Sequence, residues 1–313
     1  MKRNLSVDIL KLVMSFLIVG IHGGFLREYH LNYPFSSGIA RIGVPVFLII
    51  SGFYFYEIKS QAKFVNWVKR LFYLYIIWTM IYSILWIPDL HSYKELMKIM
   101  FYGSFHLWYL VNALYAFIFI WIIRNLKFSK QLILVIFCTI LGLLLQYGDS
   151  YNLMALSERF LRSDQYFLLY RNGLFFCFPF IMIGYFINQF SLYTRKVNWL
   201  LLLTLSFFLM AFEVVFNYFF THREGGFELL VSLYAICPIL FIYTLNKPMY
   251  STNKTVALYA TGVYLTHGFL VSVCENMGLL SNMPSVKTIA VFIVSMLITY
   301  ILVGINKKFK YIL

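Results

Sequence analysis

Charged residues are scarce in this chain. Only 12% of its 313 residues are charged, whereas 61% are hydrophobic. A soluble domain of this length would carry about a quarter charged residues. No polar stretch is long enough to form a soluble domain of its own, and apolar stretches recur along the whole length. The composition therefore predicts an all-α polytopic membrane helix bundle, with residues 1–313 forming a single integral-membrane domain.

Cysteine is also rare, and its placement excludes two kinds of site. The four cysteines, Cys138, Cys177, Cys237 and Cys274, lie within or at the ends of apolar stretches. They are too far apart for a zinc motif and too buried for a framework of disulfides. We interpret them as packing residues and predict no metal site.

The common catalytic motifs are missing as well. The sequence has no Gly-x-Ser-x-Gly elbow, no P-loop, no His-Glu-x-x-His and no Gly-x-Gly-x-x-Gly. Lys2 and Arg3 before the first apolar run resemble the start of a signal peptide. That run is too long and lacks an Ala-x-Ala-like cleavage site, so we expect a retained first span.

Apolar stretches predict about ten transmembrane helices. They cover residues 5–25, 38–57, 71–88, 105–123, 131–148, 172–190, 197–220, 228–246, 255–275 and 287–306. An even number of spans places both termini on the same side of the membrane. With a cytoplasmic N-terminus, the inside segments hold sixteen basic residues and one acid, Glu57, and the outside segments nine of each. The positive-inside rule therefore predicts that both termini are cytoplasmic.

The net charge of +14 is then explained by topology rather than by nucleic acid binding. We expect a multi-pass protein of the plasma membrane. The most basic inside segment is 59–70, with Lys59, Lys63, Lys69 and Arg70. Two interpretations of it stay open. It can anchor the protein to anionic lipid headgroups, or it can bind a phosphate-rich cytoplasmic ligand.

Polar residues form a stripe on the first span. Asp8, Lys11, Ser15 and His22 fall within about 60° of one another on a helix. Ionisable groups at membrane depth usually face a bundle interior or a wet cavity. This span is therefore predicted to form one wall of a site, with Lys11 and His22 about 16 Å apart along the axis. An ion pair between Lys11 and Asp8 is also expected.

Other polar residues are predicted to lie at the depth of His22. They are Arg41, His106, Trp108, Arg171, Asn172, Glu213 and His267. Histidine suits general acid or base chemistry near neutral pH. A lone histidine at a helix end is more often a capping or interfacial residue, but three at one depth indicate a site. Glu213 is expected to pair with Arg41 or Arg171, or to act as a base. The remaining histidines, His30, His91 and His222, are expected on solvated outside loops.

Several blocks occur in a fixed order. Lys11 is separated by ten residues from His22. The second span runs from Arg41 through Gly43-Val44-Pro45 to Ser51-Gly52, and Lys69-Arg70 precedes the third, which holds Trp78. His106-Leu107-Trp108 opens span 4, Arg171-Asn172-Gly173 and Phe178-Pro179-Phe180 mark span 6, and Gly262-Val263-Tyr264-Leu265-Thr266-His267 lies in span 9.

This ordered set resembles acyltransferase family 3, the membrane acyltransferases that modify cell-surface glycans and lipids, over nearly the whole chain. One position departs from the family pattern. The family usually has arginine where Lys11 stands, and lysine keeps the charge but loses the bidentate fork.

The resemblance implies an integral-membrane O-acyltransferase. Such an enzyme moves an acyl group, usually acetyl, from cytoplasmic acyl-coenzyme A to a hydroxyl of a cell-envelope carbohydrate or lipid-linked glycan. We hypothesise that His22 acts as general base or transient acyl carrier, and these two roles stay open. The catalytic set would be His22, Lys11, Arg41, His106 and Glu213. Lys11, Lys69 and Arg70 would bind the coenzyme, and Trp108, Arg171, Asn172 and His267 the substrate, with no tightly bound cofactor.

A second class of function also fits the sequence. Ten spans with intramembrane charges suit a transporter or exporter of a small polar molecule or a polysaccharide. The sequence shows no pair of broken helices in corresponding halves, which argues against it. Binding of acyl-coenzyme A separates the two functions, because the enzyme requires it and a permease does not.

Overall fold

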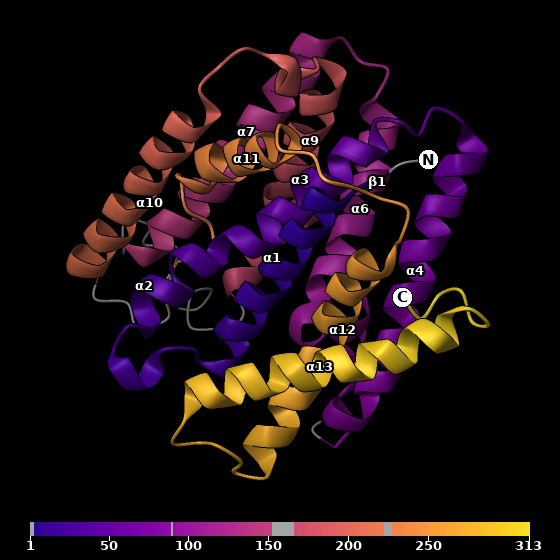
Figure 1. The fold of residues 1–313 in the computed structure, drawn as a ribbon, viewed down its shortest axis with the longest axis vertical. Helices are drawn as coiled ribbons and strands as arrows, with labels where there is room; N and C mark the ends of the chain where they lie inside the picture. Colours follow the sequence, from indigo (N-terminus) through magenta and orange to yellow (C-terminus); the bar gives the residue numbers. More distant parts are fainter. Residues whose placement is uncertain (1–2, 89, 152–165, 222–226) are drawn as a thin grey trace.

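Helices make up most of the molecule (Figure 1). The computed structural model describes residues 3–88, 90–151, 166–221 and 227–313. Among these residues, eight helices are long and apolar enough to cross a membrane. Two shorter apolar helices, Gly173–Gln189 and Leu233–Leu245, match the remaining two predicted spans. The predicted polytopic helical membrane protein is thus confirmed.

The spans are connected by short elements. The main helices are α1 (Leu5–Gly23), α3 (Gly43–Phe55), α4 (Gln61–Trp86), α6 (Trp108–Ile123), α7 (Phe128–Ser150), α9 (Phe178–Gln189), α10 (Trp199–Thr221), α11 (Leu233–Leu245), α12 (Thr255–Asn276) and α13 (Pro284–Asn306). Shorter helices are η1 (Arg27–Tyr29), α2 (Asn32–Ser36), η2 (Ile39–Ile42), α5 (Tyr93–Tyr102), η3 (Phe105–Leu107), η4 (Tyr166–Leu169), η5 (Gly173–Cys177) and η6 (Leu192–Thr194).

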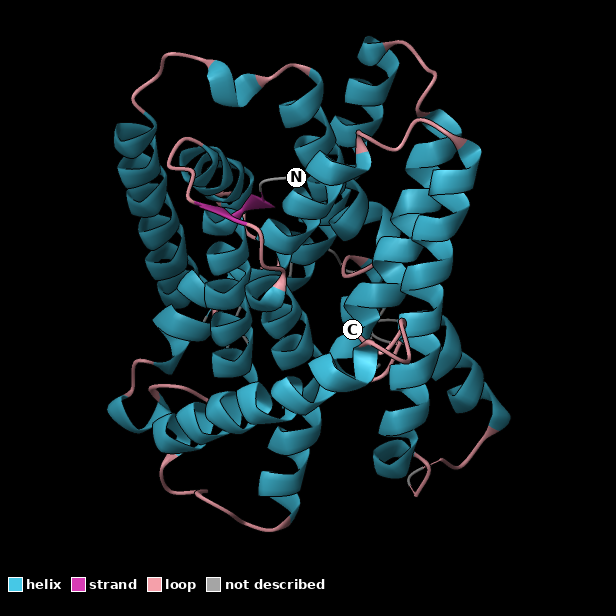
Figure 2. Ribbon diagram, turned by 45° about the vertical axis from the view of Figure 1, so that its right-hand side comes forward, coloured by secondary structure: helices cyan, strands magenta, loops and turns pink. Residues whose placement is uncertain are grey.

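Two short strands fix the start of the first span. β1 (Arg3–Asn4) and β2 (Tyr250–Ser251) pair antiparallel, and Figure 2 shows them beside the N-terminus. The Asn4 side chain then caps α1 by accepting from the Val7 N–H. At the other end, Gly24 takes a left-handed conformation (φ 75°) that ends the helix. The chain turns directly after His22, which leaves that side chain at the outer end of α1.

The third span begins earlier than predicted. We expected it to start at residue 71, after an inside loop, but α4 begins at Gln61. The Ser60 hydroxyl accepts from the Lys63 N–H and caps the helix there. Hydropathy detects only the apolar part of such a helix, so it assigns the polar first turns to a loop. Lys63, Lys69 and Arg70 therefore lie on the first turns of α4.

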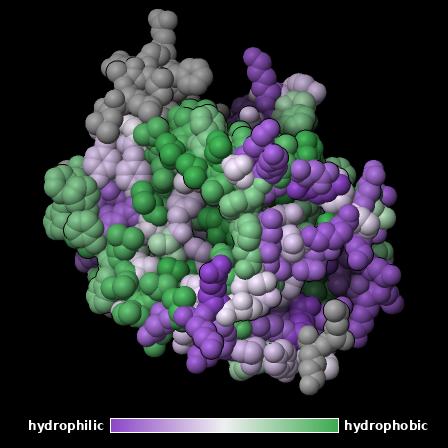
Figure 3. Space-filling view, turned by 90° about the horizontal axis from the view of Figure 1, so that it is seen from above, coloured by the Kyte–Doolittle hydropathy of each residue, from purple (hydrophilic) through white to green (hydrophobic). Residues whose placement is uncertain are grey.

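The basic turns of α4 belong to the end of the molecule seen in Figure 3. In that view, hydrophilic residues gather toward the side of α4 and hydrophobic residues toward the side of α10. This is the end that the charge distribution predicts to be cytoplasmic.

Helices α3 and α9 cross at very close range. Gly52 on α3 lies against the backbone of Ile181, and Gly184 on α9 lies against the backbone of Ile49. A Cβ atom at either glycine would overlap the facing carbonyl oxygen. Small residues at a crossing let helix backbones pack closely where no hydrophobic effect drives association. The second span is thus closely packed, and its tightest contact is at this crossing.

Helix α5 returns toward the membrane interior beside α4. The Tyr75 hydroxyl lies 2.8 Å from the Ile99 carbonyl oxygen and 2.9 Å from that of Met100. Tyr75 is eleven residues before Trp86, the end of α4, which corresponds to about 16 Å along the helix axis. The chain therefore enters η3 and α6 below the outer end of α4. This return brings His106 into the interior.

Helix α13 crosses α12 and α1 obliquely (Figures 1 and 2). Small residues again allow the approach. Gly262 on α12 faces Thr299, and Gly23 on α1 faces Thr288. Together α1, α12 and α13 form one wall of the bundle, so His22 and His267 come from neighbouring helices.

Candidate active site

Three histidines from distant parts of the sequence meet inside the bundle. His22 comes from α1, His106 from η3 and His267 from α12. The ring centroids of His106 and His267 are 4.4 Å apart, and those of His22 and His267 are 5.3 Å apart. The His22 and His106 centroids are 6.4 Å apart. The expected common depth of these residues thus corresponds to direct proximity, and we call them the histidine cluster.

His22 is the member of the histidine cluster that solvent reaches. It lines an outer cavity of about 490 Å³ together with Arg41, Asn32 and Ser36. Its side chain is exposed there, whereas His106 and His267 are 3% and 0% exposed. A molecule in the outer cavity would therefore meet His22 first.

The hydrogen bonds of His267 fix its protonation pattern. Its Nδ1 lies 2.7 Å from the Tyr264 carbonyl oxygen and 3.1 Å from that of Val263. A carbonyl oxygen only accepts hydrogen bonds, so Nδ1 carries the hydrogen, and Nε2 of the neutral ring is an acceptor. That Nε2 atom is buried and has no hydrogen-bond partner among the described residues. His267 therefore offers a lone pair inside the cluster.

His106 is held by aromatic neighbours. Its ring centroid lies 5.2 Å from that of Tyr82 and 5.0 Å from that of Tyr264. The Tyr264 hydroxyl donates to the His106 carbonyl oxygen at 2.5 Å. Gly268 leaves room for the ring, because a Cβ atom there would overlap His106 Nδ1. His106 thus forms a tightly packed back wall to the cluster.

A carboxylate that we did not anticipate pairs with both predicted arginines. Glu228 Oε1 lies 2.8 Å from Arg171 Nη1 and 3.9 Å from Arg41 Nη1. The Arg171 guanidinium also stacks on Trp108, with 4.8 Å from its central carbon to the ring centroid. Our expectation that Glu213 pairs with Arg41 or Arg171 is therefore wrong, because Glu228 takes that place.

Glu213 caps a helix instead. Its carboxylate accepts from the backbone N–H groups of Val231, at 2.7 Å, and Ser232, at 2.8 Å, and from the Tyr147 hydroxyl. These bonds fix the chain just before α11. Glu213 lines a separate lateral cavity with Tyr147 and Asn217, so the structure does not bring it into the outer cavity.

Asn172 also caps a helix by hydrogen bonds to backbone groups. Its amide oxygen accepts from the N–H groups of Leu174 and Phe175, and its amide nitrogen donates to the Leu168 and Leu169 carbonyl oxygens. It therefore caps η5 and shapes the turn that carries Arg171.

An inner cavity of about 220 Å³ lies on the other side of the histidine cluster. Lys11, Arg70 and Trp67 line it toward the basic end of the molecule, and Tyr264 and Leu265 line it toward the histidines. Lys11 thus faces this cavity and His22 the outer one, although both come from α1. Lys69 is exposed and is not part of this lining.

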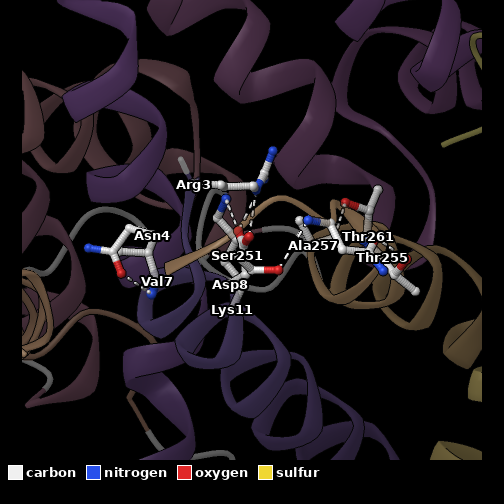
Figure 4. A network of polar contacts seen from close by, with 10 residues as sticks. Arg3, Asn4, Val7, Asp8, Lys11, Ser251, Thr255, Ala257 and Thr261 are labelled. Carbon is white, nitrogen blue, oxygen red and sulfur yellow. Dashed lines mark hydrogen bonds and ion pairs between the residues drawn. The ribbon is translucent and has the colours of Figure 1, made fainter. Parts of the chain in front are cut away.

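A small charged cluster stands at the entrance to the inner cavity. Asp8 lies between Arg3 and Lys11 in Figure 4, 2.5 Å from Arg3 Nε and 3.6 Å from Lys11 Nζ. The predicted Asp8–Lys11 ion pair is therefore present. The hydrogen bond to Asp8 holds the pKa of Arg3 above its ordinary value. With Arg70 nearby in the lining, three cations face one carboxylate, which leaves this entrance positively charged.

The other histidines lie apart from the site. His30 and His91 are exposed, as expected, and His222 lies outside the described residues. Within the described part of the chain, no group of three or more His, Cys, Asp or Glu side chains could hold a metal ion.

Comparison with known proteins identifies the family. The family model described as "Acyltransferase domain" matches residues 4–304. Two curated proteins named "Amino-acid racemase", both from Enterococcus faecalis, are each 24% identical to this chain. The matches cover 83% and 98% of this chain but only 39% and 47% of the relatives, so the chain spans less than half of their length. No solved structure matches the chain. Since the family model covers nearly every residue, this chain belongs to acyltransferase family 3.

Proposed function

We propose that this membrane acyltransferase moves an acyl group, acetyl in the simplest case, from cytoplasmic acyl-coenzyme A to a hydroxyl of a cell-envelope carbohydrate or lipid-linked glycan. One observation carries the proposal. The histidine cluster separates an inner cavity with a basic entrance from a polar outer cavity, and His22 reaches the latter. Such an arrangement suits a donor and an acceptor that arrive from opposite sides.

The inner cavity has the character that an acyl-coenzyme A arm requires. Arg3, Lys11 and Arg70 would attract the coenzyme's phosphates. Beyond them, the lining is formed by apolar and aromatic residues such as Ile18, Phe47 and Leu265, which suits the uncharged arm and its acyl group. Acyl-coenzyme A is a substrate in this proposal, and no resident cofactor is needed.

The chemistry is the transfer of an acyl group from sulfur to oxygen. The acceptor hydroxyl attacks the thioester carbonyl carbon, His22 takes the hydroxyl proton, and the new C–O bond forms as the C–S bond breaks. The proton held by His22 then passes to the departing thiolate. In the alternative route, a ring nitrogen of His22 attacks the thioester carbonyl carbon and the C–S bond breaks to release the thiolate. The acceptor hydroxyl then takes the acyl group from His22, the C–N bond breaks, and the hydroxyl proton passes to the thiolate. Arg41, in the same cavity, would stabilise negative charge that develops on the carbonyl oxygen.

His267 is suited to orient His22 in either route. Its Nδ1–H is committed to backbone carbonyl oxygens, so its buried Nε2 can only accept a hydrogen bond. If a ring N–H of His22 donates to this atom, the other nitrogen of His22 is left free to act as base. This is the logic by which a third group fixes the tautomer of a catalytic histidine.

The decisive experiment is acyl-coenzyme A binding and turnover by the purified protein in nanodiscs. We expect binding and slow hydrolysis or transfer by the wild type. His22→Ala should bind the donor but lose turnover by at least about 10²-fold, and Lys11→Ala should weaken binding. His30→Ala is the matched control, because His30 is exposed outside the site.

Two outcomes would contradict the proposal. Full turnover by a correctly folded His22→Ala variant would remove His22 from the reaction. A well-folded wild type that binds neither acetyl- nor succinyl-coenzyme A would favour the transport function, and flux of a small polar solute would then be measured.

A further inference from the structure

A groove that plays no part in the proposed reaction lies between α5 and the turn that leads into η5. Its volume is about 830 Å³. Met97 and Phe101 of α5 form one side, and Leu169, Leu174 and Phe175 form the other. The back is formed by Asn112 and Tyr115 of α6.

Several polar groups of the groove wall are already engaged. The Asn112 amide nitrogen donates to the Trp108 carbonyl oxygen, and the Tyr115 hydroxyl donates to the Phe101 carbonyl oxygen. Both ends of the Asn172 amide bond to backbone groups. A hydrophilic ligand would find few free partners on these walls, whereas a hydrocarbon chain would bury apolar surface.

Two lysines give the groove a cationic end. Lys94 and Lys98 are four residues apart on α5, so they share a face, and both line the groove. Neither lysine forms an ion pair with another residue in the part of the chain that the structure describes. The neighbouring Glu95 carboxylate accepts from the His91 N–H at 2.8 Å. Desolvation lowers the pKa of Lys98, against the opposing effect of Glu95.

The start of α5, which carries the two lysines, matches the boundary between lipid headgroups and hydrocarbon. No residue of this helix is buried, although it carries Tyr93, Phe101 and Tyr102, which are 73%, 53% and 43% exposed. Exposed aromatic residues concentrate at that boundary. Because α5 runs back toward Tyr75, its lysines lie nearer the outer surface and Phe101 lies deeper.

We propose that this groove is a binding site for a membrane lipid with an anionic phosphate headgroup. Lys94 and Lys98 hold the phosphate, and a hydrocarbon chain lies along Met97, Phe101 and Phe175. The site is independent of the acyl-transfer proposal, since none of these residues is assigned a role in it.

The test is lipid binding by the full-length protein, measured by native mass spectrometry in detergent. Phosphatidylglycerol and phosphatidylcholine with identical chains serve as probes. We expect the wild type to prefer phosphatidylglycerol, and Lys94→Gln/Lys98→Gln to weaken that binding by about tenfold or more without affecting phosphatidylcholine. Lys127→Gln/Lys130→Gln is the charge-matched control, because both lysines are exposed at the start of α7.

A second variant tests the groove without changing charge. Leu174→Trp places a larger side chain in the groove and should weaken binding of both lipids. Equal affinity of the wild type for the two lipids would overturn the proposal. Retention of phosphatidylglycerol by a folded Lys94→Gln/Lys98→Gln variant would overturn it too, as would equal loss in the Lys127→Gln/Lys130→Gln control.

Discussion

At the scale of single residues, His267 links backbone geometry to side-chain chemistry. The Tyr264 carbonyl oxygen determines which of its nitrogens carries hydrogen, and therefore which can accept from a neighbour. His267 is thus a positioning residue in our proposal, acting through His22. The ring is 0% exposed, so a substitution must also respect the packing around it.

Replacing His267 should therefore affect turnover more than donor binding. We expect His267→Phe, which keeps an aromatic ring but removes both nitrogens, to lower kcat for acyl-coenzyme A turnover by about 10²- to 10⁴-fold. His267→Gln should retain more activity, because its amide can both donate and accept. The pH profile of kcat should change in both variants. An unchanged profile with full kcat in His267→Phe would assign this residue to packing alone.

Sequence reasoning found the histidines but not their ionic neighbour. The sequence predicts His22, His106 and His267 as site residues because polar residues inside apolar spans usually face a bundle interior or a cavity. Glu228 is the first residue of the predicted span 228–246 and has no predicted role, and in the structure it lies in an irregular segment just before α11. Its position depends on Gln146 of α7, whose amide oxygen accepts from the Glu228 N–H at 3.2 Å. Contacts between residues eighty-two positions apart are not readable from one sequence.

At the scale of elements, the crossing of α3 and α9 depends on two glycines. Each lies where the opposite backbone leaves no space for a Cβ atom. From the sequence alone, Gly43, Pro45 and Gly52 within the second span indicate a bent, closely packed helix. Its partner helix could not be predicted, because a glycine indicates that another helix packs closely but not which helix it is.

Adding one methyl group at this crossing should destabilise the protein. Gly52→Ala and Gly184→Ala are each expected to lower the Tm of the detergent-solubilised protein by several degrees, because backbone atoms would have to move apart. Gly304→Ala in α13 is the control, since a Cβ atom there meets nothing within 4 Å. That change should leave Tm unchanged or raise it slightly, as alanine favours helix. Equal effects at all three positions would contradict the close crossing.

Short amphipathic helices were harder to foresee than spans. The ten residues of α5 are too few to cross a membrane, and hydropathy gives no indication that such a helix returns alongside α4. That return is nevertheless what sets the start of α6 and the depth of His106. The polar first turns of α4 are not detected for a related reason. The helix begins at Gln61, whereas the apolar stretch within it begins only at about residue 71.

At the scale of the whole molecule, the order of the spans was predictable. Every predicted span corresponds to a helix among the described residues, because about 20 apolar residues leave the chain few alternatives in a bilayer. Orientation was predicted from charge alone, and it can be measured directly.

Labelling of introduced cysteines tests that orientation. A membrane-impermeant maleimide added to intact cells should label Tyr29→Cys, since Tyr29 is 64% exposed between α1 and α2. Lys63→Cys, near the start of α4, should react only after the membrane is opened. The wild type is the background control, because three of its four cysteines are buried. The reverse pattern would invert the topology and with it the sides assigned to donor and acceptor.

The packing of the histidine cluster has a consequence for the cell's energy supply. A bilayer that stores a voltage and a proton gradient tolerates no continuous water-filled passage, yet here two cavities approach each other from opposite ends. His106 and His267, in the histidine cluster, are only 3% and 0% exposed. Under our proposal, donor and acceptor would therefore meet across the membrane while the membrane stays electrically insulating.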